Sequence, residues 1–127
     1  MSLSFDSKRT VRGQLPHISF EKIAQQILGV DYSLSLVLCG HFLAKRINNT
    51  YRKKTYSPNV LSFPLSKSEG EIFLNVRKAQ QEARQFGVSH KERLAFLFIH
   101  ACLHLRGLAH GKKMDELEIS NMKKAGF

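Results

Sequence analysis

The chain has 127 residues, 43% of them hydrophobic, and this size predicts a single domain over residues 1–127 with one buried core. Twenty lysines and arginines stand against ten acidic residues, giving a formal net charge of +10. Such an imbalance indicates a polyanionic partner, usually nucleic acid. The sequence has no apolar run of about 18 residues and no signal-peptide core at its start, so we expect a cytoplasmic protein without membrane contact.

The first half of the chain predicts two strands and two helices in alternation: a weak strand at 3–8, a helix at 18–28, a strand at 33–39 and a helix at 41–52. Gly29 ends the first helix. The second helix is expected to turn Phe42, Leu43 and Ile47 inward.

The second half predicts two strands and three helices: strands at 60–63 and 71–76, and helices at 77–86, at 94–105 with a start after Ser89, and at 113–124. Pro64 closes the first of these strands and indicates a sheet edge. A polar loop is expected at 66–70. Ser89 and Glu92 have the spacing of a capping box. The predicted class is α+β, with a small mixed sheet of about four strands packed with helices.

Three histidines in the last third of the chain have the spacing of metal ligands. His100 and His104 are four residues apart, so on a helix they lie on one face, one turn apart. Gly107 can adopt a left-handed conformation that ends the helix and brings His110 back. Three neutral imidazoles leave a fourth position for water, as in catalytic zinc sites. The pattern predicts one bound metal ion, most simply Zn²⁺.

The helix around these histidines is otherwise apolar on every face, which is typical of a buried central helix. Each unsatisfied buried imidazole would cost about 1–3 kcal/mol, and a shared metal ion would satisfy both. Cys102 follows His100 by two positions and therefore points away from the metal face. Cys102 and Cys39 are expected to be buried thiols in a reducing compartment.

Four segments, taken in chain order, resemble the YbeY family of bacterial metal-dependent endoribonucleases, which are linked to ribosomal RNA maturation and ribosome quality control. The segments are Tyr51-Arg52-Lys53-Lys54, Asn59-Val60-Leu61-Ser62-Phe63-Pro64, Gly70-Glu71-Ile72 and the histidine segment 100–110. The resemblance extends over about residues 30–124. It implies a zincin-like fold with a groove between the sheet and the central helix, and a metal near one end of that groove. It also implies zinc bound by His100, His104 and His110, and a functional role for Arg52.

The expected function is a single-strand-specific endoribonuclease with ribosomal RNA and the ribosome or its proteins as partners. A bound cation activates water, or a ribose 2′-hydroxyl, for attack on the phosphodiester, and Arg52 stabilises the charge that develops on the phosphoryl oxygens. Arg52 and His100 are therefore the expected catalytic residues. Arg52, Lys53, Lys54 and Arg106 are expected to bind the substrate. Glu71 is a candidate carboxylate near the site, although a strand residue that caps a loop is the simpler interpretation.

Four aromatic side chains are candidates for stacking on bases, but their periodicity predicts that most belong to the core: Phe42, Tyr51, Tyr56 and Phe63. Asn59 is expected to fix a turn at 57–59 rather than to contact substrate.

Departures from the family pattern keep two alternatives open. Leu108-Ala109 replaces Tyr-Asp before the third histidine, and a lost aspartate that orients a ligand can cost 10–100-fold in metal affinity or activity. The chain therefore resembles a divergent member, and a non-catalytic, zinc-stapled, ribosome-associated module is one alternative. A metal-dependent hydrolase of another substrate class is the second. Ala101, however, stands where metzincin proteases have their catalytic glutamate, which disfavours peptide hydrolysis.

Overall fold

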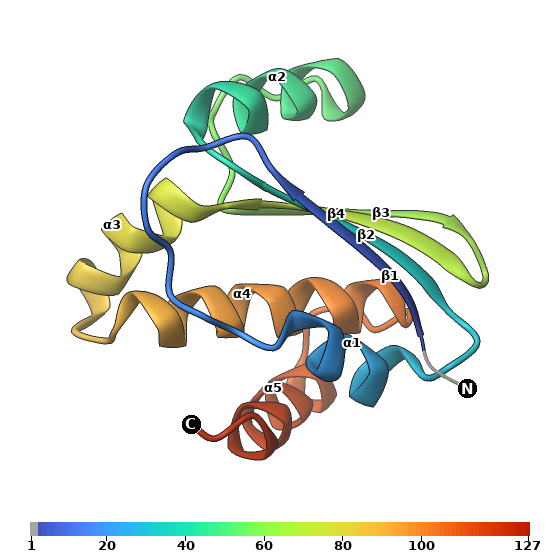
Figure 1. The fold of residues 1–127 in the computed structure, drawn as a ribbon. Coiled ribbons are helices and arrows are strands. Elements are labelled where there is room, and N and C mark those ends of the chain that lie inside the picture. The colour runs from blue at the N-terminus through green and yellow to red at the C-terminus, as the bar shows by residue number, and fades with distance from the viewer. Residues whose placement is uncertain (1–2) are drawn as a thin grey trace.

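The structure is a computed structural model that describes residues 3–127 and contains four strands and five helices in this part of the chain (Figure 1). In chain order they are β1 (Ser4–Arg9), α1 (Phe20–Leu28), β2 (Ser33–Cys39), α2 (His41–Arg52), β3 (Val60–Ser66), β4 (Glu69–Asn75), α3 (Val76–Phe86), α4 (His90–Leu105) and α5 (Lys112–Lys124). The predicted α+β class and every predicted helix and strand are confirmed. The polar loop expected at 66–70 is shorter than predicted, because β3 ends at Ser66 and β4 already begins at Glu69.

The four strands form one mixed sheet with the order β1-β2-β4-β3. β1 pairs parallel to β2 and β2 parallel to β4, whereas β3 pairs antiparallel to β4. β3 is thus an edge strand, as Pro64 predicted. The expectation that the strand closes at Pro64 is wrong, because β3 continues to Ser66 through a register shift. An edge strand tolerates proline, since one of its sides has no partner that needs the missing N–H group.

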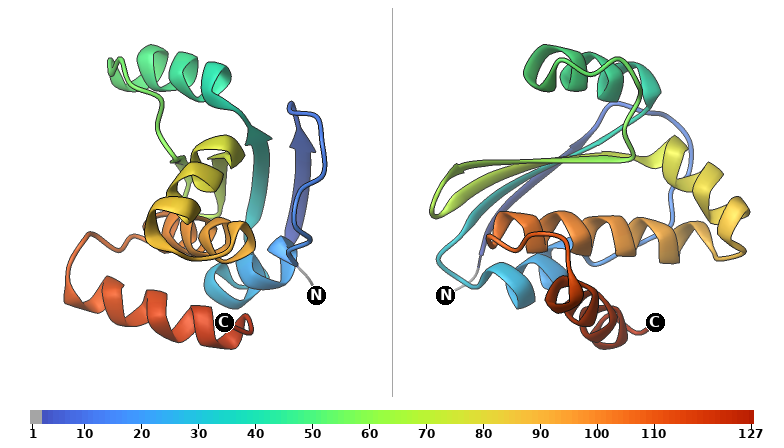
Figure 2. Two further views of the ribbon diagram at one scale, coloured as in Figure 1. Left: turned by 90° about the vertical axis from the view of Figure 1, so that its left-hand side faces the viewer. Right: turned by 180° about the vertical axis from the view of Figure 1, so that it is seen from behind.

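The helices cover the two faces of the sheet unequally. α2 lies on one side, whereas α4, α1 and α5 lie on the other (Figures 1 and 2). α4 contacts α1, α3, α5, β3 and β4 and is therefore the predicted central helix. Most of its apolar side chains are buried between the sheet and the outer helices, and those that are fully buried include Leu94, Phe98, Ile99 and Leu103. Within residues 3–127, no helix combines the length and the apolar character that crossing a membrane requires.

The predicted inward position of Phe42 is wrong. α2 packs on the sheet through Ala44, with Leu43 beside it, against Val37 and Phe73. Phe42 is 81% exposed because it lies about 200° around the helix from Ala44. Its place in the apolar pattern therefore does not reflect burial.

Gly70 lets β4 lie directly against the end of α4. A Cβ atom at this position would overlap the Tyr32 hydroxyl and would lie 2.9 Å from Leu105 Cδ1. The backbone φ of Gly70 is ordinary, so glycine is needed here for space rather than for conformation. This close approach places the C-terminal turn of α4 beside the sheet.

Candidate metal centre

The last two turns of α4 bring His100 and His104 together. Their ring centroids are 4.6 Å apart and their Nε2 atoms are 3.1 Å apart. Tetrahedral zinc with Zn–N distances of 2.0–2.1 Å separates two ligand nitrogens by about 3.3 Å. The two imidazoles thus already have nearly the separation that a shared ion requires.

Gly107 reverses the chain after α4, as predicted. Its φ is +102°, in the left-handed region, and the Leu108 N–H donates to the Leu103 carbonyl across the helix end. The reversal returns His110, whose ring centroid lies 5.1 Å from that of His100 and 4.8 Å from that of His104. One potential ligand atom from each of the three histidines lies within 4.8 Å of the others. This group can hold a metal ion.

Hydrogen bonds at the far side of two rings decide which nitrogen faces the centre. His100 Nδ1 lies 2.5 Å from Glu118 Oε2, and His104 Nδ1 lies 3.0 Å from the Leu108 carbonyl oxygen. A carboxylate and a carbonyl only accept, so both Nδ1 atoms must donate. Both Nε2 atoms then carry lone pairs that face each other at 3.1 Å. Two such lone pairs repel unless a cation lies between them, so the donor set fits a metal ion.

Burial favours the form of His104 that binds metal. The pKa of His104 is lowered, first because burial penalises the imidazolium and second because His100 lies beside it. The hydrogen bond to Leu108 acts in the opposite direction. Only the neutral imidazole offers a lone pair to a metal, so the lowered pKa keeps this ligand competent to lower pH.

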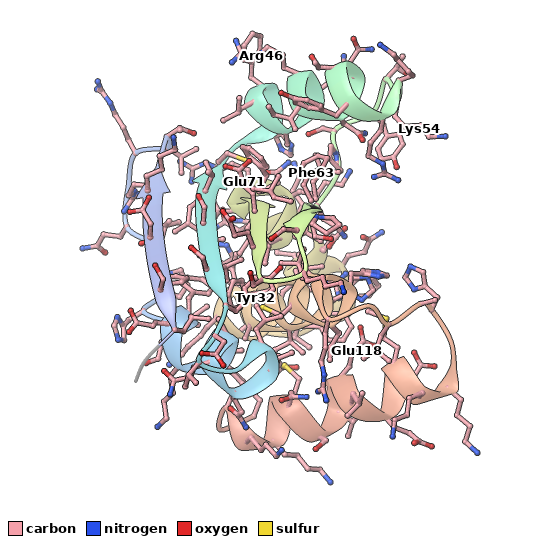
Figure 3. The ribbon with its side chains drawn as sticks, turned by 90° about the vertical axis from the view of Figure 1, so that its right-hand side faces the viewer. Tyr32, Arg46, Lys54, Phe63, Glu71 and Glu118 are labelled. Carbon is pink, nitrogen blue, oxygen red and sulfur yellow. The ribbon has the colours of Figure 1, made fainter. Side chains whose placement is uncertain are left out.

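Glu118 is the functional residue that the sequence reasoning missed. It lies on α5, is 7% exposed, and in Figure 3 it appears between α5 and the end of α4. A signal was present, because Glu118 follows Met114 by four residues and thus shares the face that α5 was predicted to bury. The replacement of the aspartate by Ala109 does not leave the ligands without partners. His104 bonds to a main-chain carbonyl, and a carboxylate from another helix holds His100.

A cavity of about 470 Å³ opens between the histidines and the edge strand. The end of α2, the β3 region and the C-terminal part of α4 with the loop after it supply its lining: Arg52, Asn59, Val60, Leu61, Ser62, Pro64, Ala101 and the three histidines. The structure therefore brings Arg52 to the same cavity as the metal ligands. The other predicted substrate residues, Lys53, Lys54 and Arg106, are exposed but do not line this cavity.

The simpler interpretation of Glu71, a strand residue outside the site, is confirmed. Glu71 lies in β4 and faces away from the metal ligands, because it pairs with Phe63 and Ser35 on the α2 side of the sheet (Figure 3). The alternation of a strand instead turns its neighbour Ile72 into the core. The expectation that most of the four candidate aromatic residues belong to the core is wrong, since Tyr51 is 68% exposed and Tyr56 is 54% exposed. The Tyr51 ring lies beside half-buried Phe63, at 5.6 Å between centroids.

The fold and the site define a small α+β protein with a three-histidine metal-binding group on its central helix. Residues 5–126 match the model of the family described as Endoribonuclease YbeY. The chain belongs to the YbeY family.

Relatives and a solved structure agree with this assignment. The chain is 38% identical to Endoribonuclease YbeY of Polynucleobacter asymbioticus, over 65% of this chain and 59% of that protein. It is 32% identical to Endoribonuclease YbeY of Alkaliphilus metalliredigens, over 74% of this chain and 66% of that protein. The chain thus spans less than two thirds of the length of these two relatives. The solution structure of TM1509 from Thermotoga maritima is similar, with a TM-score of 0.64, 26% identity and coverage of 83% of this chain and 75% of that one.

Proposed function

We propose that this protein is a zinc-dependent endoribonuclease that cuts single-stranded RNA during ribosomal RNA maturation in the cytoplasm. The observation that supports this proposal most directly is the presence of Arg52 and the three histidines in one cavity. Every ionisable side chain in the lining is an arginine or a histidine. A cavity of this composition favours an anionic substrate such as a phosphodiester. The names of the two relatives support the same activity.

The lining of the metal cavity argues against peptide hydrolysis. Ala101 lines the cavity beside His100, at the position where metzincin proteases have their general base. No carboxylate lines this cavity among the residues that the structure describes. Glu118 does not fill the role, because it is buried behind His100 and bonds to the Nδ1 atom that faces away from the centre.

Each residue of the cavity has a role in the proposed reaction. His100, His104 and His110 hold a divalent cation, which when bound acidifies water and polarises a phosphoryl oxygen. Arg52 donates from its planar guanidinium to the non-bridging oxygens of the scissile phosphate and stabilises the charge that develops there. Glu118 and the Leu108 carbonyl fix the rings of His100 and His104 so that their Nε2 atoms remain directed at the cation. Lys53, Lys54 and Arg106 bind flanking phosphates of the RNA as it enters or leaves the cavity, and the ribosome supplies the RNA.

The test compares four proteins purified without a chelator or a metal-affinity column: wild type, His100→Ala, Arg52→Ala and Arg46→Ala. Arg46 is a matched control, because it is an exposed arginine on the same helix and in Figure 3 it lies on the outer side of α2. Single-stranded RNA should be cut by wild type and Arg46→Ala. Arg52→Ala should be slower by about 100-fold, the usual effect of removing a donor to a developing charge. His100→Ala should be inactive and should lose bound zinc by metal analysis.

The outcomes separate the proposal from its alternatives. Equal cutting by all four proteins identifies a contaminating nuclease and refutes the proposal. If none of them cuts RNA, but the wild type binds zinc and its melting temperature falls on chelation, the zinc-stapled module is the better description. If wild type hydrolyses esters or casein and leaves RNA intact, the protein is a hydrolase of another substrate class.

A further inference from the structure

A second hollow adjoins the metal cavity on the far side of Arg52. It has a volume of about 330 Å³ and shares Arg52, Asn59 and Val60 with the metal cavity. Its other walls come from the loop before β3 and from one face of α3, and they include Tyr56, Lys78 and Glu82. The two hollows therefore form one groove, with the histidines at one end and Lys78 at the other.

The Asn59 side chain is held in a fixed orientation in this groove. Its Nδ2 atom lies 3.2 Å from Glu82 Oε1 and 3.1 Å from Glu82 Oε2. A carboxylate only accepts hydrogen bonds, so the amide nitrogen must face Glu82 and the amide oxygen must point elsewhere. Glu82 is fixed in turn by Arg93, whose Nη2 atom lies 2.9 Å from Glu82 Oε1. This pairing also offsets the negative charge of Glu82.

The main chain around Asn59 is fixed as well. The Asn59 carbonyl accepts from the Asn75 N–H at 2.9 Å. The buried Asn75 side chain donates to the Pro58 carbonyl at 3.0 Å and to Ser57 Oγ at 3.1 Å. Asn48 donates to the Tyr56 carbonyl at 3.1 Å. The loop at 56–59 is thus tied to β4 and α2, which makes it a preorganised wall.

The Asn59 amide oxygen has no hydrogen-bond partner within residues 3–127. In this part of the chain the side-chain atoms that are both buried and without a partner are Tyr32 Oη and Asn48 Oδ1. The Asn59 oxygen is not one of them. The oxygen is therefore open to solvent in a groove whose remaining charges, on Arg52 and Lys78, suit phosphates. A ligand that uses this acceptor together with the two cations must offer a hydrogen-bond donor beside its phosphates. In RNA that donor is the ribose 2′-hydroxyl, which DNA lacks.

We propose that the second hollow binds the nucleotide next to the scissile phosphate, and that the Asn59 amide oxygen accepts a hydrogen bond from its ribose 2′-hydroxyl. Lys78 contacts the following phosphate, and the half-exposed Tyr56 ring lies beside the base. This inference rests on the proposed function, because it takes the scissile phosphate to lie between Arg52 and the histidines. It adds a residue by which the site selects RNA over DNA.

The first experiment varies the substrate and leaves the wild-type protein unchanged. A short single-stranded RNA with one mapped cut is made with a 2′-deoxy substitution at each position in turn. One position next to the cut should lower kcat/KM by about three- to tenfold, the effect of one hydrogen bond. If the 2′-hydroxyl at the cut is itself the nucleophile, its removal abolishes cutting, which distinguishes that position from the one that Asn59 contacts.

The second experiment repeats the series with Asn59→Ala and with Gln85→Ala as a control. Gln85 is an exposed amide on α3 that does not line the groove. For Asn59→Ala, kcat/KM with the all-ribose substrate should be lower than that of wild type by the same three- to tenfold. The deoxy substitution at the sensitive position should then cause no further decrease in kcat/KM. Gln85→Ala should behave as wild type. If the decrease caused by Asn59→Ala and the decrease caused by the deoxy substitution multiply at every position, Asn59 does not contact a 2′-hydroxyl and the inference is wrong.

Binding measurements keep this inference separate from the proposed function. Fluorescence anisotropy with RNA and DNA of the same sequence gives the ratio of the affinity for RNA to the affinity for DNA. This ratio should be smaller in Asn59→Ala than in wild type by about three- to tenfold. If wild type cuts nothing but shows this change, the proposed function fails and the subsite stands. If wild type cuts RNA but the ratio is unchanged, the subsite fails and the function stands. Should Asn59→Ala not fold, as judged by its melting curve, Asn59→Ser provides the same comparison.

A last comparison tests the phosphate end of the groove. Lys78→Ala should reduce the slope of log affinity against log salt by about one, as expected for one lost phosphate contact. Lys123→Ala removes the same charge from an exposed position on α5 and should leave the slope unchanged. Equal slopes for the two variants would overturn the assignment of Lys78.

Discussion

Removal of the negative charge behind His100 should weaken metal binding. Glu118 is buried, and its Oε2 atom lies 2.5 Å from His100 Nδ1, which makes this a short, charge-assisted hydrogen bond. Loss of a residue that orients a metal ligand typically costs 10–100-fold in affinity. Glu118→Gln retains an amide oxygen that can accept from Nδ1, so it should lose about tenfold, or about 1.4 kcal/mol. Glu118→Ala removes the acceptor as well and should lose about 100-fold, or about 2.7 kcal/mol.

The assay is competition for zinc between the protein and a chromogenic chelator of known affinity. Glu116→Gln is the matched control, because Glu116 is an exposed glutamate two residues away on the same helix. The control removes the same formal charge, so it reports the contribution of net charge alone. Identical zinc affinities for Glu118→Gln and Glu116→Gln would refute the reasoning that the buried carboxylate supports His100.

Three further predictions concern stability and reactivity. The pKa of His104 is lowered in the folded protein from its ordinary value of 6.5, so below that pH the unfolded chain binds more protons. Urea unfolding of the metal-free protein should therefore show a free energy of unfolding that falls from pH about 7.5 to about 5.5, and a flat profile would contradict this. Burial raises the pKa of the Cys39 thiol to about 11 and also raises that of Cys102, so neither should react with Ellman's reagent near neutral pH until denaturant is added. Gly70→Ala should cost about 1–3 kcal/mol in chemical denaturation, since its Cβ overlaps the Tyr32 hydroxyl. Tyr32→Phe removes a buried hydroxyl without a partner and should restore part of that loss, whereas no restoration would show that the overlap is not the cause.

Local rules were sufficient for most of the fold and for the three ligands. Helix and strand periods, with Ser89 as a cap and glycines at helix ends, predicted every element. Ser89 Oγ accepts from the Glu92 N–H at 3.0 Å, which is the first of the two hydrogen bonds of a capping box. The histidines could be predicted because their geometry depends on one helical turn and one left-handed glycine, both of which are fixed within eleven consecutive residues, 100–110.

Contacts between distant segments could not be predicted in this way. Glu118 reaches His100 from another helix, and the sequence alone does not say how α5 packs on α4. The exposure of Phe42 has the same origin, since the apolar pattern of a helix does not reveal which of its faces meets the sheet. Asn59 was expected to fix a turn, and its main chain does help to hold the loop, but its link to Glu82 on α3 was not visible in the sequence.

Glu118 and Glu82 have one role in common. Glu118 lies behind the metal cavity and holds His100, and Glu82 lies at the wall of the adjoining hollow and holds Asn59. Each is also beside a basic partner, His100 for Glu118 and Arg93 for Glu82, which lowers the repulsion that a phosphate would experience. Both carboxylates therefore orient a residue of the proposed substrate groove, and each is paired with a basic group. Glu82 also lines the second hollow, where its pairing with Arg93 offsets its charge. This arrangement explains how a groove proposed to bind a polyanion can contain carboxylates, and it links the metal centre and the neighbouring hollow as parts of one proposed RNA-binding surface.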